Sequence, residues 1–500
     1  MMVKKILDLL LINPGGRKKI YQELGETLTA VEPPLWCRLL AGYARDRGLT
    51  VTILDSEAEN LDIVEIAEKV ASIEPCLAVM VVFGHQPSAS TQMMVGAGEA
   101  CKAIKNKVPE QSLLMVGGHV SALPQRTLTE EYVDFVCKGE GPETIVQLIG
   151  ALKKKEVTLD SVQGLVWQDS SGEIILNPPA PLTTNLDADL HGNVWDLLPM
   201  DKYRAHNWQC FGNLKSREPY ASVFTSLGCP YKCSFCCINA PFDTNRYRMR
   251  SPESVVEEIE YLNSEYGIKT FKFIDEMFVL NERHVTNICN GLIEKNIPDL
   301  NIWAYARVDT VKPHMLEILQ RAGFRWLALG IESGSKHVRD GADKAFEQDD
   351  IVNIVRQIQS AGIFVAANYI FGLPDDDEIS MRETLDLAKK LNCEYANFYS
   401  AMAYPGSPLY VMALEKGWEL PDSWSGYSQH SYDCKPLSTE KVSAAQVLSF
   451  RDGAFHEYFG SPRYLDRITQ RFGWETRTHI EEMGKTRLKR KILENSFAAE

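Results

Sequence analysis

The stretch Ser226-Leu-Gly-Cys-Pro-Tyr-Lys-Cys-Ser-Phe-Cys-Cys-Ile-Asn-Ala240 holds three cysteines in the spacing C-x3-C-x2-C. They are Cys229, Cys233 and Cys236, and they directly follow a strand-like run over 220–225. One short loop after a strand therefore carries all three thiols. Three thiolates this close together suit a soft metal centre, either iron–sulfur or zinc.

The zinc alternative lacks a fourth ligand near this loop. A structural zinc site needs four Cys or His ligands. Cys237 is adjacent to Cys236, where neighbouring side chains rarely point the same way, and the nearest histidines, His206 and His284, lie tens of residues away. Three ligands and one open position instead fit a [4Fe–4S] cluster whose fourth iron binds a substrate or cofactor.

Length and composition indicate a multidomain globular protein. The 500 residues predict two or three domains, and 45% hydrophobic with 24% charged residues is ordinary for globular chains. A net charge of −14 argues against a nucleic-acid partner. Twelve scattered cysteines do not form a disulfide framework and indicate the reducing cytoplasm. Because no apolar run reaches about 18–20 residues, we expect no transmembrane segment.

Residues 1–150 alternate short apolar runs with helix-length segments. The predicted strands are Leu7–Asn13, Val51–Asp55, Leu77–Phe83, Leu113–Val116 and Val133–Cys137. The predicted helices cover 35–47, 61–72, 90–106, 124–131 and 142–153. Unbroken apolar strands alternating with helices predict a doubly wound, Rossmann-like α/β domain whose parallel sheet is covered on both faces.

The ends of these strands are rich in glycine. Ligands of such sheets bind outside the carboxyl ends of the strands, and glycine lets the backbone approach a large flat ligand closely. Neither a Gly-x-Gly-x-x-Gly nor a P-loop phosphate motif occurs in this part of the chain. The candidate binding residues at these ends are Asn13, Pro14, Gly84, His85, Gly117, Gly118, His119, Gly139, Glu140 and Gly141.

The remainder divides into a connector, a second α/β domain and a C-terminal extension. Residues 151–219 form the connector, with a β-hairpin over 164–176. Residues 220–410 again alternate strands with helices, which predicts a partial barrel, and residues 411–500 are mainly helical, over 439–459, 463–471 and 477–495. The predicted barrel strands are Ala221–Thr225, Thr270–Ile274, Asn301–Ala306, Trp326–Gly330, Phe364–Ile370 and Tyr395–Tyr399.

The cysteine loop, with Phe235 before its last cysteine, resembles the loop that defines the radical S-adenosylmethionine (radical SAM) superfamily. Six strands alternating with helices match that family's partial (β/α)6, TIM-like barrel. The resemblance implies a [4Fe–4S] cluster on Cys229, Cys233 and Cys236 whose open iron chelates SAM, which is then cleaved to a 5′-deoxyadenosyl radical. Barrel active sites lie at the strand ends. The SAM contacts implied there are Phe235, Asp275, Glu276, Arg307, Glu332, Ser333 and Gly372.

The N-terminal domain resembles the cobalamin-binding domain that precedes the barrel in one class of radical SAM enzymes. The matching pieces are Asn13-Pro14, Pro33-Pro34-Leu35, Asp55, Gly117-Gly118-His119 and Gly139-Glu140-Gly141. One departure is that the loop after the first strand lacks the Asp-x-His-x-x-Gly motif, so cobalamin is expected to bind base-off without a protein histidine there. His85 and His119 stand at strand ends, where each either faces the corrin or only caps its loop.

The two resemblances together imply a cobalamin-dependent radical SAM methyltransferase. Such an enzyme transfers a methyl group from SAM via methylcobalamin to an unactivated carbon or phosphorus of a small-molecule substrate. It would need an electron donor such as flavodoxin or ferredoxin. Porphyrin, lipid, phosphonate, antibiotic and peptide substrates are all open.

Three alternatives remain at this stage. The first is a radical cyclase or other carbon-skeleton enzyme, similar to the anaerobic porphyrin cyclases. The second is an enzyme that keeps the N-terminal domain without binding the corrin. The third is a non-enzymatic cobalamin or cluster sensor, for which the sequence carries no visible output module.

Overall fold

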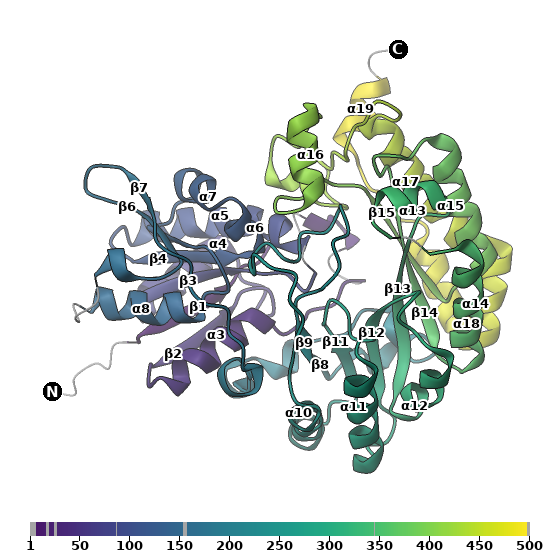
Figure 1. Ribbon diagram of the computed structural model, residues 1–500, viewed down its shortest axis with the longest axis horizontal. Coiled ribbons are helices and arrows are strands. Elements are labelled where there is room, and N and C mark those ends of the chain that lie inside the picture. Colours follow the sequence, from purple (N-terminus) through teal and green to yellow (C-terminus); the bar gives the residue numbers. More distant parts are fainter. Residues whose placement is uncertain are drawn as a thin grey trace.

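The computed structural model describes residues 7–16, 20–24, 28–86, 88–153, 158–344 and 346–497. Two sheets, one of seven strands and one of six, form two domains that lie side by side (Figure 1). The N-terminal domain is purple and blue in that view, the barrel is teal and green, and the C-terminal helices, in yellow, pack on the far side of the barrel. The predicted fold class is confirmed.

The first sheet has the strand order β2-β1-β3-β4-β5-β6-β7, and its first five strands are parallel. These strands are β1 (Leu9–Asn13), β2 (Val51–Asp55), β3 (Leu77–Val82), β4 (Leu113–Gly117) and β5 (Phe135–Cys137). Helices cover both faces because alternate strand residues point to opposite sides. Leu9 and Leu11 belong to the core under α3 (Leu35–Asp46) and α8 (Pro142–Leu152), whereas Leu10 and Ile12 pack under α4 (Ile63–Ile73) and α5 (Ala89–Lys107).

The predicted hairpin exists but belongs to this sheet. Its strands are β6 (Leu165–Gln168) and β7 (Ile174–Leu176), and β6 pairs antiparallel with β5. The first sheet therefore continues beyond residue 150, where the sequence placed the start of a separate connector. Pairing with β5 satisfies backbone groups that would otherwise leave β5 an unpaired edge.

The second sheet is a parallel six-stranded partial barrel in the order β15-β14-β13-β12-β11-β8. Its helices α10 (Pro252–Tyr266), α11 (Glu282–Lys295), α14 (Gln348–Ser360) and α15 (Glu378–Leu391) lie outside the strands. The sheet edges are β8 and β15, so the barrel has an open side. The strands are β8 (Tyr220–Val223), β11 (Thr270–Phe273), β12 (Asn301–Arg307), β13 (Phe324–Glu332), β14 (Phe364–Phe371) and β15 (Tyr395–Ser400).

The C-terminal extension is helical, but several predicted helix boundaries were wrong. Helix α17 (Ala444–Phe459) begins only after Ser443, whose hydroxyl caps it in a reciprocal pair with Gln446. Helix α18 (Pro462–Met483) joins the two predicted C-terminal helices across a kink at Gly473, and α19 starts at Lys491. In the described part of the chain, no helix is long and apolar enough to cross a membrane.

A buried carboxylate ties the two domains together. Glu258 of α10 accepts hydrogen bonds from Arg38 of α3 at 3.2 Å, from Arg250 at 2.5 Å and from the indole of Trp195 in the connector at 3.1 Å. The two arginines and the glutamate are all at most 4% exposed. Arg38 also donates to the backbone oxygen of Ser222 on β8. Burial raises the pKa of Glu258, but the two guanidinium groups outweigh it and hold this pKa below its ordinary value.

Replacing Glu258 with glutamine tests this junction. Glu258→Gln removes the carboxylate that pairs with both guanidinium groups and leaves Arg250 only its longer 3.8 Å contact with Asp187. We therefore expect the free energy of unfolding to fall by about 3–5 kcal/mol. Urea denaturation of the metal-free protein measures the change. The control is Glu482→Gln, which breaks an exposed pair with Lys485 and should cost at most about 1 kcal/mol. If Glu258→Gln lowers the free energy of unfolding no more than Glu482→Gln does, Glu258 does not hold the two domains together.

Candidate functional site

The cysteine loop leaves the end of the first barrel strand and is closed at its base by a small antiparallel pair. Strand β9 (Ser226–Leu227) pairs with β10 (Arg248–Met249), and the loop lies between them. Gly228 has φ +85°, and a Cβ there would collide with the backbone oxygen of Arg246. Glycine is therefore required where the two ends of the loop approach each other.

Asp275 holds the start of this loop. Its carboxylate accepts from the Thr225 backbone N–H at 2.6 Å, from the Thr225 hydroxyl at 2.5 Å and from the Ser226 hydroxyl at 2.6 Å. The side chain is buried and does not line the cavity described below. Asp275, predicted as a SAM contact, thus holds the start of the cysteine loop from the side that faces away from the cavity.

The three cysteines face one cavity and fit an iron–sulfur cluster. Cys229, Cys233 and Cys236 all line it, together with Phe235, and all are free thiols. In the described ranges, no three His, Cys, Asp or Glu side chains are placed to hold one metal ion. A cubane cluster differs from a single ion, because each thiolate binds a separate iron and the sulfurs stay further apart. Cys237 also lines the cavity, but its side chain packs in a separate buried cluster with Met402 and Tyr404. The other three thiols of the loop suit an iron–sulfur cluster.

Burial favours the protonated form of two of these thiols, those of Cys229 and Cys236. Burial raises the pKa of Cys229 to about 11 and raises that of Cys236 well above its ordinary value. Metal binding to these groups must therefore release protons.

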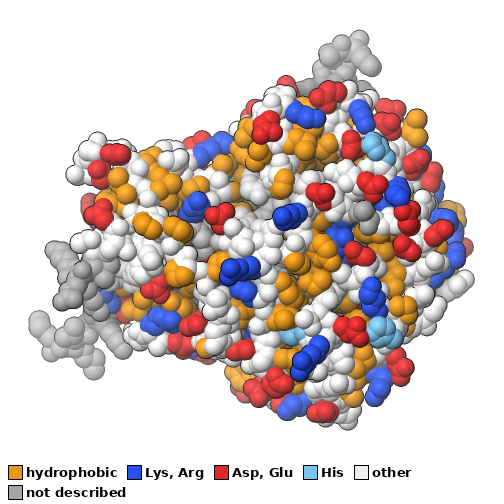
Figure 2. Space-filling view, in the orientation of Figure 1, with side chains coloured by type: hydrophobic (Ala, Val, Ile, Leu, Met, Phe, Trp, Pro, Cys, Tyr) orange, Lys and Arg blue, Asp and Glu red, His pale blue; other side chains and the backbone are white. Residues whose placement is uncertain are grey.

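The cavity lies between the two domains and has a volume of about 630 Å³. The N-terminal domain contributes Asn13, Pro14, Gly84 and His85 to its wall. Figure 2 shows hydrophobic side chains gathered near the middle of the face of the molecule that it draws, where the two domains meet. The barrel contributes the cysteine loop and the predicted residues Glu276, Arg307 and Glu332. Side chains predicted from two distant parts of the sequence thus line one cavity.

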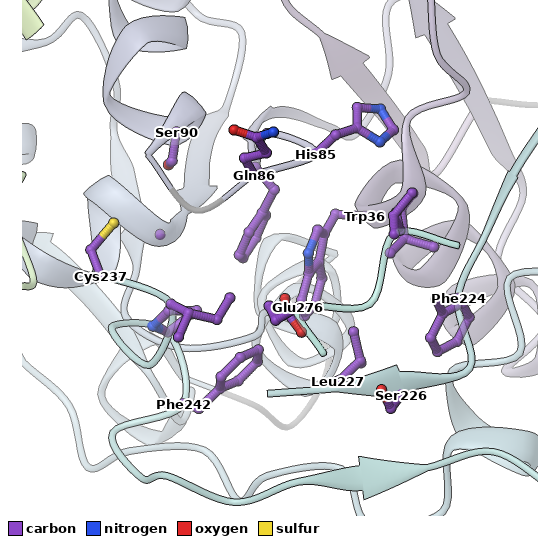
Figure 3. Close-up of a pocket in the computed structure, with 17 residues that line it drawn as sticks. Trp36, His85, Gln86, Ser90, Phe224, Ser226, Leu227, Cys237, Phe242 and Glu276 are labelled. Carbon is purple, nitrogen blue, oxygen red and sulfur yellow. The ribbon is translucent and has the colours of Figure 1, made fainter. Parts of the chain in front are cut away.

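Glu276 lies where the barrel end faces the N-terminal domain. Its carboxylate accepts from the Gly228 backbone N–H at 3.2 Å. Burial raises its pKa to about 7. It also lines a smaller pocket next to the cavity, which Figure 3 shows.

Glu332 stands at the end of β13 in a left-handed conformation, φ +65°, beside a register shift in the sheet. Its carboxylate pairs with the buried ammonium of Lys344, which also donates to the Gly330 backbone oxygen at 3.1 Å. Lys344 lines the cavity but was missed in the sequence analysis. No local spacing marks a lysine 12 residues from its partner, and only the fold brings the two together.

Ser333 and Gly372 lie behind the cavity wall rather than on it. The Ser333 hydroxyl bonds Thr384 at 3.1 Å, and the Gly372 N–H donates to Asp376 at 3.0 Å. A Cβ on Gly372 would press on Val447 of α17. Both predicted SAM contacts therefore have internal packing roles in this structure.

The smaller pocket is bounded by the N-terminal strand ends and the cysteine loop (Figure 3). Trp36 stacks on Phe83 with ring centroids 4.1 Å apart, and Gly84, Gly118 and Cys237 complete the wall. This pocket, about 40 Å³, is too small to hold a corrin ring by itself, but it shares Phe83, Gly84 and His85 with the 630 Å³ cavity. Apolar side chains and close backbone approach at the strand ends of this combined space suit a corrin.

His85 points away from the centre of this pocket in Figure 3. Its Nδ1 lies 3.9 Å from the carboxylate of Glu32 and has no hydrogen-bond partner among the described residues. Burial lowers the pKa of His85 to about 4, so the ring is neutral near pH 7. His119 is buried elsewhere, bonded to Thr91 at 3.1 Å and edge-on to Trp424. His85 thus lines the pocket and the cavity with its ring turned from the pocket centre, whereas His119 lines neither.

The remaining strand-end residues have structural contacts. A Cβ on Gly117 would collide with the backbone of Val82 in the neighbouring strand. Glu140 accepts from Arg248 of β10 at 2.6 Å and from the Thr183 N–H at 3.0 Å, so it links the first domain to the cysteine loop. Gly139 and Gly141 flank it with positive φ angles of 127° and 99°, which favour glycine.

Comparison with known proteins matches each domain separately. Residues 23–149 match the family model of the B12 binding domain, and residues 223–388 match that of the Radical SAM superfamily. The chain is 31% identical over 462 residues to a protein of Pyrococcus horikoshii named "Uncharacterized methyltransferase PH0819", covering 92% of this chain and 94% of that protein.

A second relative and a solved structure extend the comparison. The anaerobic magnesium-protoporphyrin IX monomethyl ester cyclase of Cereibacter sphaeroides is 26% identical, over 88% of this chain and 68% of the cyclase. The methyltransferase TsrM of Kitasatospora setae, solved with cobalamin and a [4Fe-4S] cluster bound, superposes with a TM-score of 0.67 at 20% identity, covering 91% of this chain and 89% of TsrM. That likeness shows a shared fold.

Both domain models match in order, and the Pyrococcus relative aligns over nearly its whole length. The chain therefore belongs to the family of radical SAM enzymes that carry an N-terminal B12-binding domain.

Proposed function

We propose that this protein is a cobalamin-dependent radical SAM methyltransferase that modifies a small molecule. One observation carries the proposal: the cysteine loop, the barrel strand ends and the N-terminal strand ends all line one cavity between the domains. The Pyrococcus relative named as a methyltransferase, and the hopanoid C-3 methylase of Methylococcus capsulatus, 25% identical over 75% of this chain, support methyl transfer.

Within this proposal, the protein's residues hold and orient the reactants. Cys229, Cys233 and Cys236 would hold the cluster, and Glu276, Glu332 and Lys344 would contact SAM from the barrel ends. When bound, the cluster with SAM supplies radical chemistry and cobalamin supplies a methyl carrier. The two domains flank the cavity and would limit the access of water to reactive intermediates.

The barrel interior provides a place for the substrate. Below the cysteine loop the cavity is lined by Tyr305, Asn368, Tyr395 and Tyr399. Trp208 of the connector closes the bottom, packing its ring 5.1–5.4 Å from the rings of three barrel residues, Trp303, Trp326 and Tyr395. Aromatic faces with a few polar groups are typical of small-molecule sites.

The cofactors also imply a setting and a partner. All twelve cysteines are free thiols, which supports a reducing compartment, the cytoplasm. Reduction of the cluster requires an electron donor, and flavodoxin or ferredoxin is the donor we propose.

Isotope-labelled SAM tests the proposed reaction. The protein is reconstituted anaerobically with iron, sulfide and cobalamin, then incubated with reductant, SAM bearing a deuterated methyl group, and an extract of small metabolites. We expect S-adenosylhomocysteine, 5′-deoxyadenosine and a metabolite carrying the label, all detected by mass spectrometry. Formation of 5′-deoxyadenosine with neither of the other two would favour the cyclase alternative.

Single substitutions test the three cluster ligands. We expect Cys229→Ala, Cys233→Ala and Cys236→Ala each to abolish binding of a full cluster, because Cys237, the fourth thiol of the loop, packs in a separate buried cluster with Met402 and Tyr404. Iron and sulfide content and the visible spectrum report the outcome. Cys237→Ala is the matched control and should keep the full cluster. Loss of the cluster in Cys237→Ala would contradict the assignment of the three ligands.

Lys344→Met tests the residue that the sequence analysis missed. Removing a buried cation from the cavity wall should weaken SAM binding about tenfold, the effect of one lost charge-assisted hydrogen bond. Anaerobic calorimetry on the reconstituted protein measures the affinity. Lys336→Met, which removes an exposed partner of Glu347, is the control and should bind SAM normally. Unchanged affinity in Lys344→Met would refute the assignment.

A further inference from the structure

The side chain of Arg307, the last residue of β12, lies against the cysteine loop. Its Nη1 donates to Cys233 Sγ at 3.7 Å, and its guanidinium carbon stands 3.8 Å above the centre of the Tyr231 ring. Asp309 accepts from Nε at 2.9 Å and from Nη2 at 3.1 Å. We name Tyr231, Arg307 and Asp309 the arginine clamp.

The clamp fixes which nitrogen faces the cysteine. The bidentate contact with Asp309 occupies the Nε and Nη2 edge, so the Nη1 edge turns toward Cys233. Stacking on Tyr231 sets the plane of the guanidinium group. The Arg307 backbone N–H donates to the Thr310 hydroxyl at 3.1 Å, which anchors the strand end as well. With 4% exposure, the side chain has little freedom to turn elsewhere.

A donor at this sulfur has a definite electrostatic effect. When a cluster accepts one electron, the added negative charge spreads onto its thiolate sulfurs. A buried cation that hydrogen-bonds one of these sulfurs stabilises the reduced form more than the oxidised form, and hydrogen bonds to sulfur are among the determinants of cluster potential.

We propose that Arg307 is a positioning residue for the iron–sulfur cluster, which orients Cys233 and raises the reduction potential, rather than a ligand for the carboxylate of SAM. This inference rests on the proposed cluster at Cys229, Cys233 and Cys236. It replaces the role that the strand-end position alone suggested for Arg307. Tyr231 and Asp309 act through Arg307.

Redox titration of the reconstituted full chain tests the inference. Without SAM, the protein is equilibrated with dithionite and mediator dyes, and the reduced cluster is quantified by electron paramagnetic resonance. In Arg307→Met, the ratio of reduced to oxidised cluster at a fixed potential should fall about tenfold, the equivalent of one charge-assisted hydrogen bond. Asp309→Glu, which keeps both charges but displaces the carboxylate that holds Nε and Nη2, should shift the ratio less and in the same direction.

Lys312→Met is the matched control. It removes an exposed cation that donates to the Asp309 backbone oxygen at 2.8 Å and contacts no cysteine, so its titration should match the wild type. If Arg307→Met fails to hold a cluster, Arg307→Lys and Asp309→Glu decide the question, because both keep the charges near the loop and change only the geometry of the contact with Cys233.

The outcomes separate this inference from the proposed function. A wild-type protein that assembles no cluster contradicts the proposed function itself. If the wild-type protein assembles a cluster, and the Arg307 and Asp309 variants have the same reduction potential as the wild type, the inference alone is overturned. Unchanged potential together with weakened SAM binding in Arg307→Met would return Arg307 to the role of a SAM contact.

Discussion

The arrangement of the two domains depends on the buried carboxylate of Glu258. Burying one carboxylate and two guanidinium groups is costly unless each is paired and hydrogen-bonded. Glu258 of the barrel meets that condition only with Arg38 of the N-terminal domain, Arg250 beside the cysteine loop and Trp195 of the connector all in place. Because any displacement of one domain would strand a buried charge, this cluster holds the domains in one relative position.

A second ion pair places the N-terminal domain at the open side of the barrel. Glu32 precedes α3, and its carboxylate lies 3.0 Å from Lys272 on β11 and accepts from the Tyr220 hydroxyl at 2.8 Å. Burial raises the pKa of Glu32, but neighbouring His85 and Lys272 hold it well below its ordinary value, so the carboxylate is charged. The partial barrel therefore has its lumen walled in part by the other domain, and the cavity belongs to both.

Much of the fold was predictable because strand and helix periodicities are local. The strand Val51–Asp55 was predicted with the boundaries observed, and all six barrel strands lie where the apolar runs placed them. The predictions were wrong where a tertiary contact or a single backbone angle determines how strands pair or where a helix ends. The hairpin after residue 150 joins the first sheet because β5 offers it an edge, and the predicted C-terminal helices merge across Gly473. Neither effect has a signal in hydrophobic pattern.

The sequence by itself determined that Cys229, Cys233 and Cys236 lie together, since C-x3-C-x2-C places them on one loop without a distant partner. It also determined the two α/β domains through their alternating apolar runs. Only the tertiary structure decided which strand-end residues face the cavity. It placed Glu276 and Glu332 on the wall, turned Asp275 inward to hold the loop, and brought Lys344 to Glu332. Spacing along a chain specifies the backbone position of a side chain, whereas its direction depends on the hydrogen bonds and charges that the completed fold supplies.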